Sequence, residues 1–175
     1  SLTSLGGGPA LDGLTNLISI GGYLNIGDNH WGGNVDLLSV DLTDLETIGR
    51  ALNVECNPDL ENLAGLTSLE SMGSLFLYQN SGLTSLGFNL TTSTLNSITI
   101  SNCPLLTDVS CLVVVTSLTC SLSIYGDNNS LTTLEAFDDL ISIAGNLKIG
   151  EPPYPTGSGG NPNLELIGFP ELITI

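Results

Sequence analysis

The residues most able to do acid–base or nucleophilic chemistry are unevenly distributed in this chain. It has 18 acidic residues against two basic ones, Arg50 and Lys148, and its single histidine is His30. A hydrolase needs two carboxylates that face each other across a cleft. A lyase acting on an acidic sugar needs a base among cations, but the two cations are several repeats apart. No motif builds a catalytic group around His30 either, so we expect no catalytic residues and no enzyme activity.

The four cysteines are Cys56, Cys103, Cys111 and Cys120. The chain has no C-x-x-C motif, so neither a bound metal nor another cofactor is expected. In an oxidising compartment four cysteines allow two disulfides with three possible pairings. Cys111 and Cys120 lie within one repeat and are the preferred disulfide, whereas Cys56 and Cys103 are about two strand spacings apart (~9.6 Å), beyond the ~7 Å limit for bonded cysteines. Cys103 is also compatible with a buried free thiol.

A leucine-rich repeat in the sequence positions all of these residues. Each copy holds a short L-x-[LIV] segment, and leucines at intervals of three follow it, as in Leu60, Leu63, Leu66 and Leu69. The short segments begin at residues 24, 52, 75, 98, 122 and 147. A spacing this regular is the signature of a solenoid, and we therefore predict one solenoid domain over residues 1–175, with about six rungs.

The spacing within each copy predicts its local structure. Alternate residues of L-x-[LIV] point inward from a strand, and later leucines at intervals of three suit tight, 3₁₀-like backbone. Glycines such as Gly49, Gly73 and Gly145 are expected to adopt positive φ at sharp corners. A small polar residue five positions after each strand begins is expected to hydrogen-bond the buried turn backbone. These polar residues are Asn29, Asn57, Asn80, Cys103 and Asp127.

The repeat resembles the leucine-rich repeat superfamily, and more narrowly the receptor L domain and related repeats of fungal cell-wall glycoproteins. The segment 17–26, with Gly21-Gly22-Tyr23-Leu24, and the segment 52–60, with Asn57-Pro58, carry the resemblance. It covers essentially the whole chain, although the copies near 90–122 are degenerate. The resemblance implies a right-handed solenoid with one parallel sheet, used outside the cell for ligand binding or wall organisation. It names no ligand.

Residues that alternate with the inward ones form two outward columns on the sheet. The columns bring Phe76, Tyr78 and Tyr125 together as a central aromatic patch, which is suited to stacking on sugar rings or anchoring a protein. Aromatic residues also favour strands for packing reasons alone, and that interpretation stays open. The columns are Asn25, Asn53, Phe76, Thr99, Ser123, Lys148 and Gly27, Glu55, Tyr78, Ser101, Tyr125, Gly150.

Two copies of the repeat carry insertions just after the strand. One insertion contains His30 and Trp31, and the other, at residues 151–160, contains Tyr154. Insertions in solenoids map to one face and often carry function. We therefore add His30, Trp31 and Tyr154 to the candidate binding residues, with the alternative that Trp31 folds back over the edge of the solenoid.

Charge and sequons restrict the partner and the compartment. A net charge of −16 argues against nucleic acid, which needs clustered cations, and no stretch approaches the ~20 apolar residues of a membrane span. Asn89-Leu90-Thr91 and Asn128-Asn129-Ser130 are N-glycosylation sequons. We predict an extracellular or cell-surface location, with Asn89 and Asn128 as glycosylation candidates.

The sequence therefore favours recognition over chemistry. We expect an extracellular recognition or adhesion module that binds a protein or glycan through its sheet face and corner loops. The alternative is a structural filament or coat. The chain starts and stops within a repeat, without a polar capping unit, so copies of the chain would assemble head to tail. Ice binding is disfavoured because the L-T-x-L threonines fall at two repeat positions.

Overall fold

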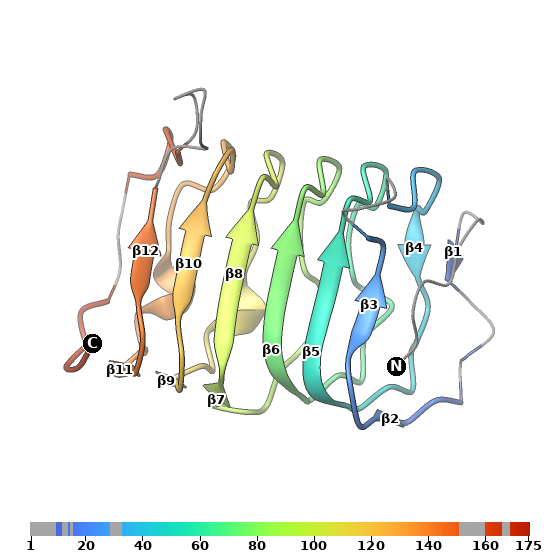
Figure 1. Cartoon of the computed structure of the whole chain (residues 1–175), viewed down its shortest axis with the longest axis horizontal. Coiled ribbons are helices and arrows are strands. Elements are labelled where there is room, and N and C mark those ends of the chain that lie inside the picture. The colour runs from blue at the N-terminus through green and yellow to red at the C-terminus, as the bar shows by residue number, and fades with distance from the viewer. Residues whose placement is uncertain (1–9, 12–13, 15, 29–32, 151–159, 166–168) are drawn as a thin grey trace.

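The computed structural model describes residues 10–11, 14, 16–28, 33–150, 160–165 and 169–175. Along this part of the chain the backbone winds as a parallel-sheet β-solenoid of about five turns (Figure 1). The predicted solenoid is thus confirmed at this level. Its strands lie side by side in chain order, so each coil contacts mainly the coils before and after it.

One face of the solenoid is a seven-stranded parallel sheet. Its path is β12–β10–β8–β6–β5–β2, and β3 also pairs with β5. The strand starts read from the repeat all fall within it, in one register: Leu24 pairs with Leu52, Leu52 with Leu75 and Leu75 with Ile98. The strands are β2 (Ser19–Ile20), β3 (Leu24–Ile26), β5 (Thr47–Glu55), β6 (Ser71–Tyr78), β8 (Ser97–Ser101), β10 (Leu122–Tyr125) and β12 (Leu147–Ile149).

Short elements complete the other sides of the coils. A two-stranded sheet joins β1 (Ala10–Leu11) to β4 (Ser39–Val40), and a three-stranded sheet joins β7 (Thr94–Leu95), β9 (Ser117–Leu118) and β11 (Ser142–Ile143). Two 3₁₀ turns, η1 (Ser110–Leu112) and η2 (Glu135–Phe137), lie behind the large sheet (Figure 1). Most of the backbone behind the sheet is therefore irregular.

The leucines at intervals of three form the core. Leu60, Leu63, Leu66 and Leu69 are all fully buried. The backbone between them turns tightly, because the N–H of Leu66 donates to the carbonyl of Leu63 at 3.0 Å and that of Leu69 to Leu66 at 3.1 Å. Each turn spans three residues and brings the next leucine inward, as the spacing predicted.

The glycines that precede the L-x-[LIV] segments have a different role from the one predicted. Gly49, Gly73 and Gly145 do not have positive φ. A Cβ on Gly49 would lie 2.7 Å from the carbonyl oxygen of Gly21, and one on Gly73 would overlap the carbonyl of Arg50 in the preceding coil. These positions need glycine because neighbouring backbones approach too closely for a side chain.

Behind the end of the large sheet, five asparagines and one cysteine form a ladder with one rung per coil, and its four central members are buried. We call Asn34, Asn57, Asn80, Cys103, Asn128 and Asn161 the corner ladder. Asn57 Nδ2 donates to the carbonyl of Ile26 at 2.9 Å and to Asn80 Oδ1 at 3.1 Å. Asn80 Nδ2 donates to the carbonyl of Val54 at 2.8 Å. The side-chain amides thus satisfy backbone groups that the corner leaves buried.

The corner ladder confirms the predicted polar position at Asn57, Asn80 and Cys103 but corrects it at Asp127. Asp127 is exposed, and Asn128 takes the ladder position, with its Oδ1 accepting from the backbone N–H of Cys103 at 3.0 Å. The shift arises because the corner after β10 is one residue longer: Gly126, at φ 73, takes the place that Asn102 has in the preceding coil at φ 56, and Asp127 is the additional residue. Asn29 lies outside the described residues; in its coil Asn34 donates to Asn57 Oδ1 at 2.9 Å.

Candidate functional site on the sheet face

The outer side of the seven-stranded sheet carries the two outward columns that the sequence predicted. In the first column Asn25 pairs with Asn53, Asn53 with Phe76, and Phe76 with Thr99. In the second column Glu55 pairs with Tyr78. Each strand positions its outward residues through the burial of the residues on either side, as Leu75 and Leu77 are buried around Phe76. Each coil therefore contributes one residue to each of the two columns, and the columns form a continuous face.

The central aromatic residues meet on this face. Tyr78 and Tyr125 flank Ser101, which pairs with both of them, and Phe76 lies two residues before Tyr78 on β6. The side chain of Tyr78 lies close to those of Thr99 and Tyr125. Burial, the neighbouring Tyr125 and Glu55 together raise the pKa of Tyr78, against the opposing effect of Thr99. The rings of Phe76, Tyr78 and Tyr125 therefore form one contiguous patch on the sheet face.

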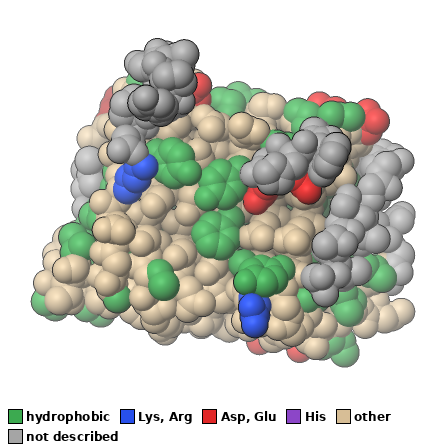
Figure 2. Space-filling model, viewed as in Figure 1, with side chains coloured by type: hydrophobic (Ala, Val, Ile, Leu, Met, Phe, Trp, Pro, Cys, Tyr) green, Lys and Arg blue, Asp and Glu red, His purple; other side chains and the backbone are tan. Residues whose placement is uncertain are grey.

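Each of the chain's two cations stacks on a tyrosine of the same face. The Lys148 ammonium lies 4.6 Å from the ring centroid of Tyr125. The Arg50 guanidinium lies 5.5 Å from the ring centroid of Tyr23, and its Nη1 is 3.4 Å from the Tyr23 hydroxyl. Cation–π contacts of this kind hold a long side chain over a ring. Figure 2 shows the result as an oblique band of apolar side chains with a basic residue at each end.

We call this band the aromatic stripe. Its apolar members lie on β6, on β10 and just before β3, and its two cations lie on β5 and β12. It differs from the predicted patch by the addition of Lys148, which was predicted as a column residue only, and of Tyr23 and Arg50, which the L-x-[LIV] pattern did not include because both precede that motif in their coils. The β-bulge between Ile48 and Ala51 in β5 is the local feature that the pattern misses. The stripe consists of Arg50, Tyr23, Phe76, Tyr78, Tyr125 and Lys148.

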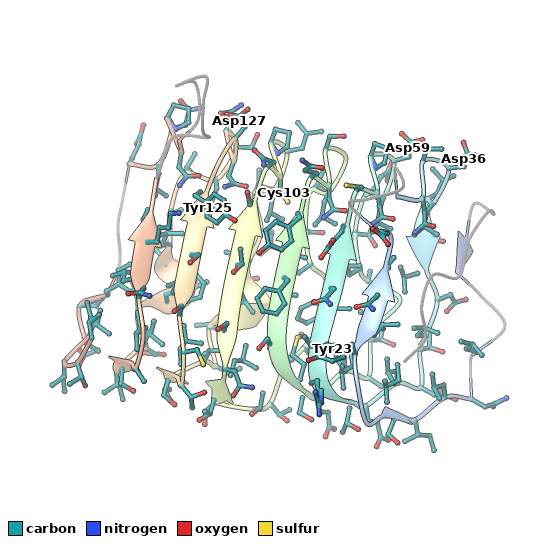
Figure 3. All side chains as sticks on the ribbon, in the orientation of Figure 1. Tyr23, Asp36, Asp59, Cys103, Tyr125 and Asp127 are labelled. Carbon is teal, nitrogen blue, oxygen red and sulfur yellow. The ribbon has the colours of Figure 1, made fainter. Side chains whose placement is uncertain are left out.

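Acidic residues are nearly absent from the strands beneath the stripe. Among the described strands of the seven-stranded sheet, Glu55 is the single acid, although the chain has 18. Asp36, Asp59 and Asp127 instead project from the loops at one edge of the solenoid (Figure 3). The sheet face thus combines both basic residues of a strongly acidic chain with four of its aromatic rings.

Several predicted site residues do not belong to the stripe. His30, Trp31 and Tyr154 lie outside the described residues. Asn89 is exposed, which leaves its sequon accessible. Asn128 is fully buried, and its Nδ2 donates to the carbonyl of Tyr125 at 2.9 Å and to Asn161 Oδ1 at 3.0 Å. A glycan on Asn128 would break the corner ladder, so the structure argues against that candidate.

The four cysteines are free thiols in this structure, so the predicted disulfide between Cys111 and Cys120 is not formed. Although they share a coil, Cys111 lies in η1 while Cys120 lies exposed beyond β9. Burial raises the pKa of Cys111 to about 12 and that of Cys103 to about 11. Cys111 also lines a cavity of about 300 Å³ with Phe88 and Val114, away from the large sheet.

The described residues contain neither a metal-binding cluster nor a membrane-spanning helix. In the described part of the chain, no three or more His, Cys, Asp or Glu residues are grouped to hold a metal ion. No helix found there has the length and apolar character needed to cross a bilayer. No family model, curated protein or solved structure matches the chain.

Proposed function

We propose that this protein is an extracellular recognition module and that its ligand, a glycan or a protein, binds across the aromatic stripe. The observation that carries the proposal is the register of the sheet. Three strand pairings place Phe76, Tyr78 and Tyr125 on one open face. These three side chains are half-buried, and contiguous, partly exposed rings on a rigid scaffold are the usual anchors of a binding surface.

The proposed solenoid type is the leucine-rich repeat of the receptor L-domain kind, right-handed and with six rungs. Support comes from the position of the buried polar residue, which follows the strand in coil after coil, as Asn57 and Asn80 do. The short strand before it and the buried leucines at intervals of three after it give further support. An experimental structure would measure the handedness directly, and a left-handed coil would overturn this assignment.

Binding through the stripe is tested by removing its rings. A triple variant, Phe76→Ser with Tyr78→Ser and Tyr125→Ser, should lose binding at least tenfold on arrays of glycans and peptides that retain the wild-type protein. The matched control is Leu105→Ser with Ile141→Ser, two exposed apolar residues outside the large sheet, which should bind as the wild type does. Equal loss in both variants would mean that binding does not use this face.

The location outside the cell and the head-to-tail filament are separate predictions with their own tests. Protein secreted from eukaryotic cells should carry a glycan on Asn89. The variant Asn89→Gln should then show a lower mass, and a secreted wild-type protein without a glycan would remove this support for an extracellular location.

The head-to-tail filament is tested by the mass of the native protein in solution and by negative-stain images. Monodisperse monomers would support recognition, and regular fibres would support the filament.

A further inference from the structure

The two cations of the aromatic stripe point to the chemical class of its ligand. We propose that the stripe binds an acidic oligosaccharide, with sugar rings over the aromatic side chains and carboxylates beside Lys148 and Arg50. This inference rests on the recognition function proposed above and goes further by naming the ligand class. The argument has three parts: the distribution of charge, the geometry of the stripe and the form of the surface.

The charge distribution favours an anionic ligand that carries few charges. Both basic residues of the chain lie on this face, where Glu55 is the one acid in the strands. A ligand with a carboxylate near each cation would gain charge-assisted hydrogen bonds. A densely charged polyanion would instead be repelled by the other acids around the solenoid. The best match is a sugar chain whose carboxylates are separated by neutral units.

The geometry fixes how far apart those carboxylates would lie. β12 and β5 are separated by four strand spacings along the sheet, which is ~19 Å. Arg50 also lies three residues before Asn53, the residue in register with the Lys148 column, and three residues span about 10 Å along a strand. The cations therefore mark the two ends of a path long enough for an oligosaccharide. The cation–π contacts hold each cation at its place on that path.

The path between the cations offers what sugar rings require. Tyr125 (Figure 3), Tyr78 and Phe76 lie on the outer side of the sheet at neighbouring register positions. Polar side chains border them, and Asn53 Nδ2 donates to Asn25 Oδ1 at 2.6 Å beside the stripe. Sugars combine apolar ring faces with peripheral hydroxyls, so alternating rings and amides match them.

A peptide fits this surface less well. Extended peptides bind by adding a strand to a free sheet edge, but beneath the stripe the backbone of β6 pairs with β5 on one side and β8 on the other. Folded protein partners commonly insert anchor residues into pockets. The described cavity that Cys111 lines is not on this face. An acidic peptide is therefore the competing ligand that the test must distinguish.

The test compares hyaluronan decasaccharide, which has one carboxylate in each disaccharide, with its carboxyl-reduced form and with poly-glutamate, by calorimetry. We expect the wild-type protein to bind the acidic sugar at least tenfold more tightly than the reduced sugar. Lys148→Gln with Arg50→Gln should remove this preference, and Lys148→Arg with Arg50→Lys should keep most of it. Glu55→Gln should tighten binding of the acidic sugar, because it removes the one acid in the described strands of the sheet. Thermal midpoints near that of the wild type would show that the variants are folded.

Each other outcome overturns the inference in a recognisable way. Equal affinity for acidic and reduced sugars, with both lost in the triple ring variant, would leave the recognition function in place but remove the role of charge. Binding of poly-glutamate and not of either sugar would make the ligand a peptide. If no probe binds and the arrays are also blank, the recognition function itself fails.

Discussion

The corner ladder stacks one side chain per coil, whereas the aromatic stripe crosses the coils obliquely with two residues on β6 and none on β8. The two also differ in burial and in variety. Asn57, Asn80 and Asn128 are fully buried, and the same amide recurs in most coils of the ladder. The stripe lies on the sheet face a few residues earlier in each coil, where phenylalanine, tyrosine, lysine and arginine stand at exposed or half-buried positions. One repeat thus produces two kinds of column.

This contrast shows how a solenoid can separate the residues that stabilise it from the residues that bind a ligand. A ladder position must satisfy the same buried carbonyl in every coil, so its chemistry is fixed by the backbone. A side chain on the sheet face contacts mainly its neighbours in the same column, so few packing constraints fix its residue type. That residue type can therefore be suited to a ligand. Substitutions in the two columns should therefore separate stability from binding.

The largest expected effect is in the corner ladder, at Asn80. Asn80→Ala leaves the backbone N–H of Asn57 and the carbonyl of Val54 without their partner, which should lower the free energy of unfolding by about 2–5 kcal/mol. The matched control is Asn53→Ala on the sheet face, where Asn53 is half-buried and its Oδ1 has no partner. Urea unfolding of both variants checks the prediction, and equal losses would erase the contrast between the columns.

The next effect concerns the close approach of neighbouring coils. A methyl group at Gly73 would overlap the carbonyl of Arg50, so Gly73→Ala should cost about 1–3 kcal/mol through backbone displacement. Gly22 has open space around its Cβ position and provides the control, because Gly22→Ala should be nearly neutral. Thermal melts of the two variants would show the difference. A neutral Gly73→Ala would mean that the coils are less tightly stacked than the structure describes.

The interruption of the corner ladder at Cys103 should appear as a pH dependence. Burial raises the pKa of the Cys103 thiol to about 11 in the folded state, from an ordinary value of 9.0. The unfolded chain therefore ionises first, so this stabilisation is complete below pH 9 and is lost as the pH rises toward 11. The loss should reach about 1–2 kcal/mol near pH 10.5. Unfolding measured between pH 8 and 10.5 should show a shallower slope in Cys103→Ala. An unchanged slope would assign the alkaline loss to other groups, such as Tyr78.

The sequence predicts the structure of the regular repeat better than that of the positions where a single coil departs from it. Leu24, Leu52 and Leu75 set a spacing from which the strands and both outward columns follow, because inward and outward positions alternate in any strand. The ladder shifts to Asn128 because Asp127 adds one residue after Gly126, a change that spacing alone does not locate. Likewise, Cys111 and Cys120 belong to the same coil, but Cys111 lies in η1 and Cys120 lies beyond β9.

The same distinction between regular and irregular positions applies to the candidate site. Phe76, Tyr78 and Tyr125 are predicted because they stand at column positions, and their register is confirmed. The pairing of Arg50 with Tyr23 is not predicted, because it depends on where the β5 bulge directs a long side chain. Local irregularities in a repeat decide which side chains meet, and only the three-dimensional structure shows them.

The smallest expected effect is at Gln79, in the corner after β6. It tests whether the left-handed backbone there is kept when the side chain is removed. Gln79 is exposed at φ 55, and the corner of β10 has Gly126 at φ 73 in the corresponding place. Left-handed backbone costs a residue with a side chain about 1–2 kcal/mol, part of which glycine gives back through its greater flexibility when unfolded. Gln79→Gly should therefore raise the free energy of unfolding by up to about 1 kcal/mol, whereas Gln79→Ala should not. If both variants destabilise the protein equally, the hydrogen bond from Cys56 Sγ to Gln79 Oε1 at 3.0 Å would be more important to this corner than its backbone conformation.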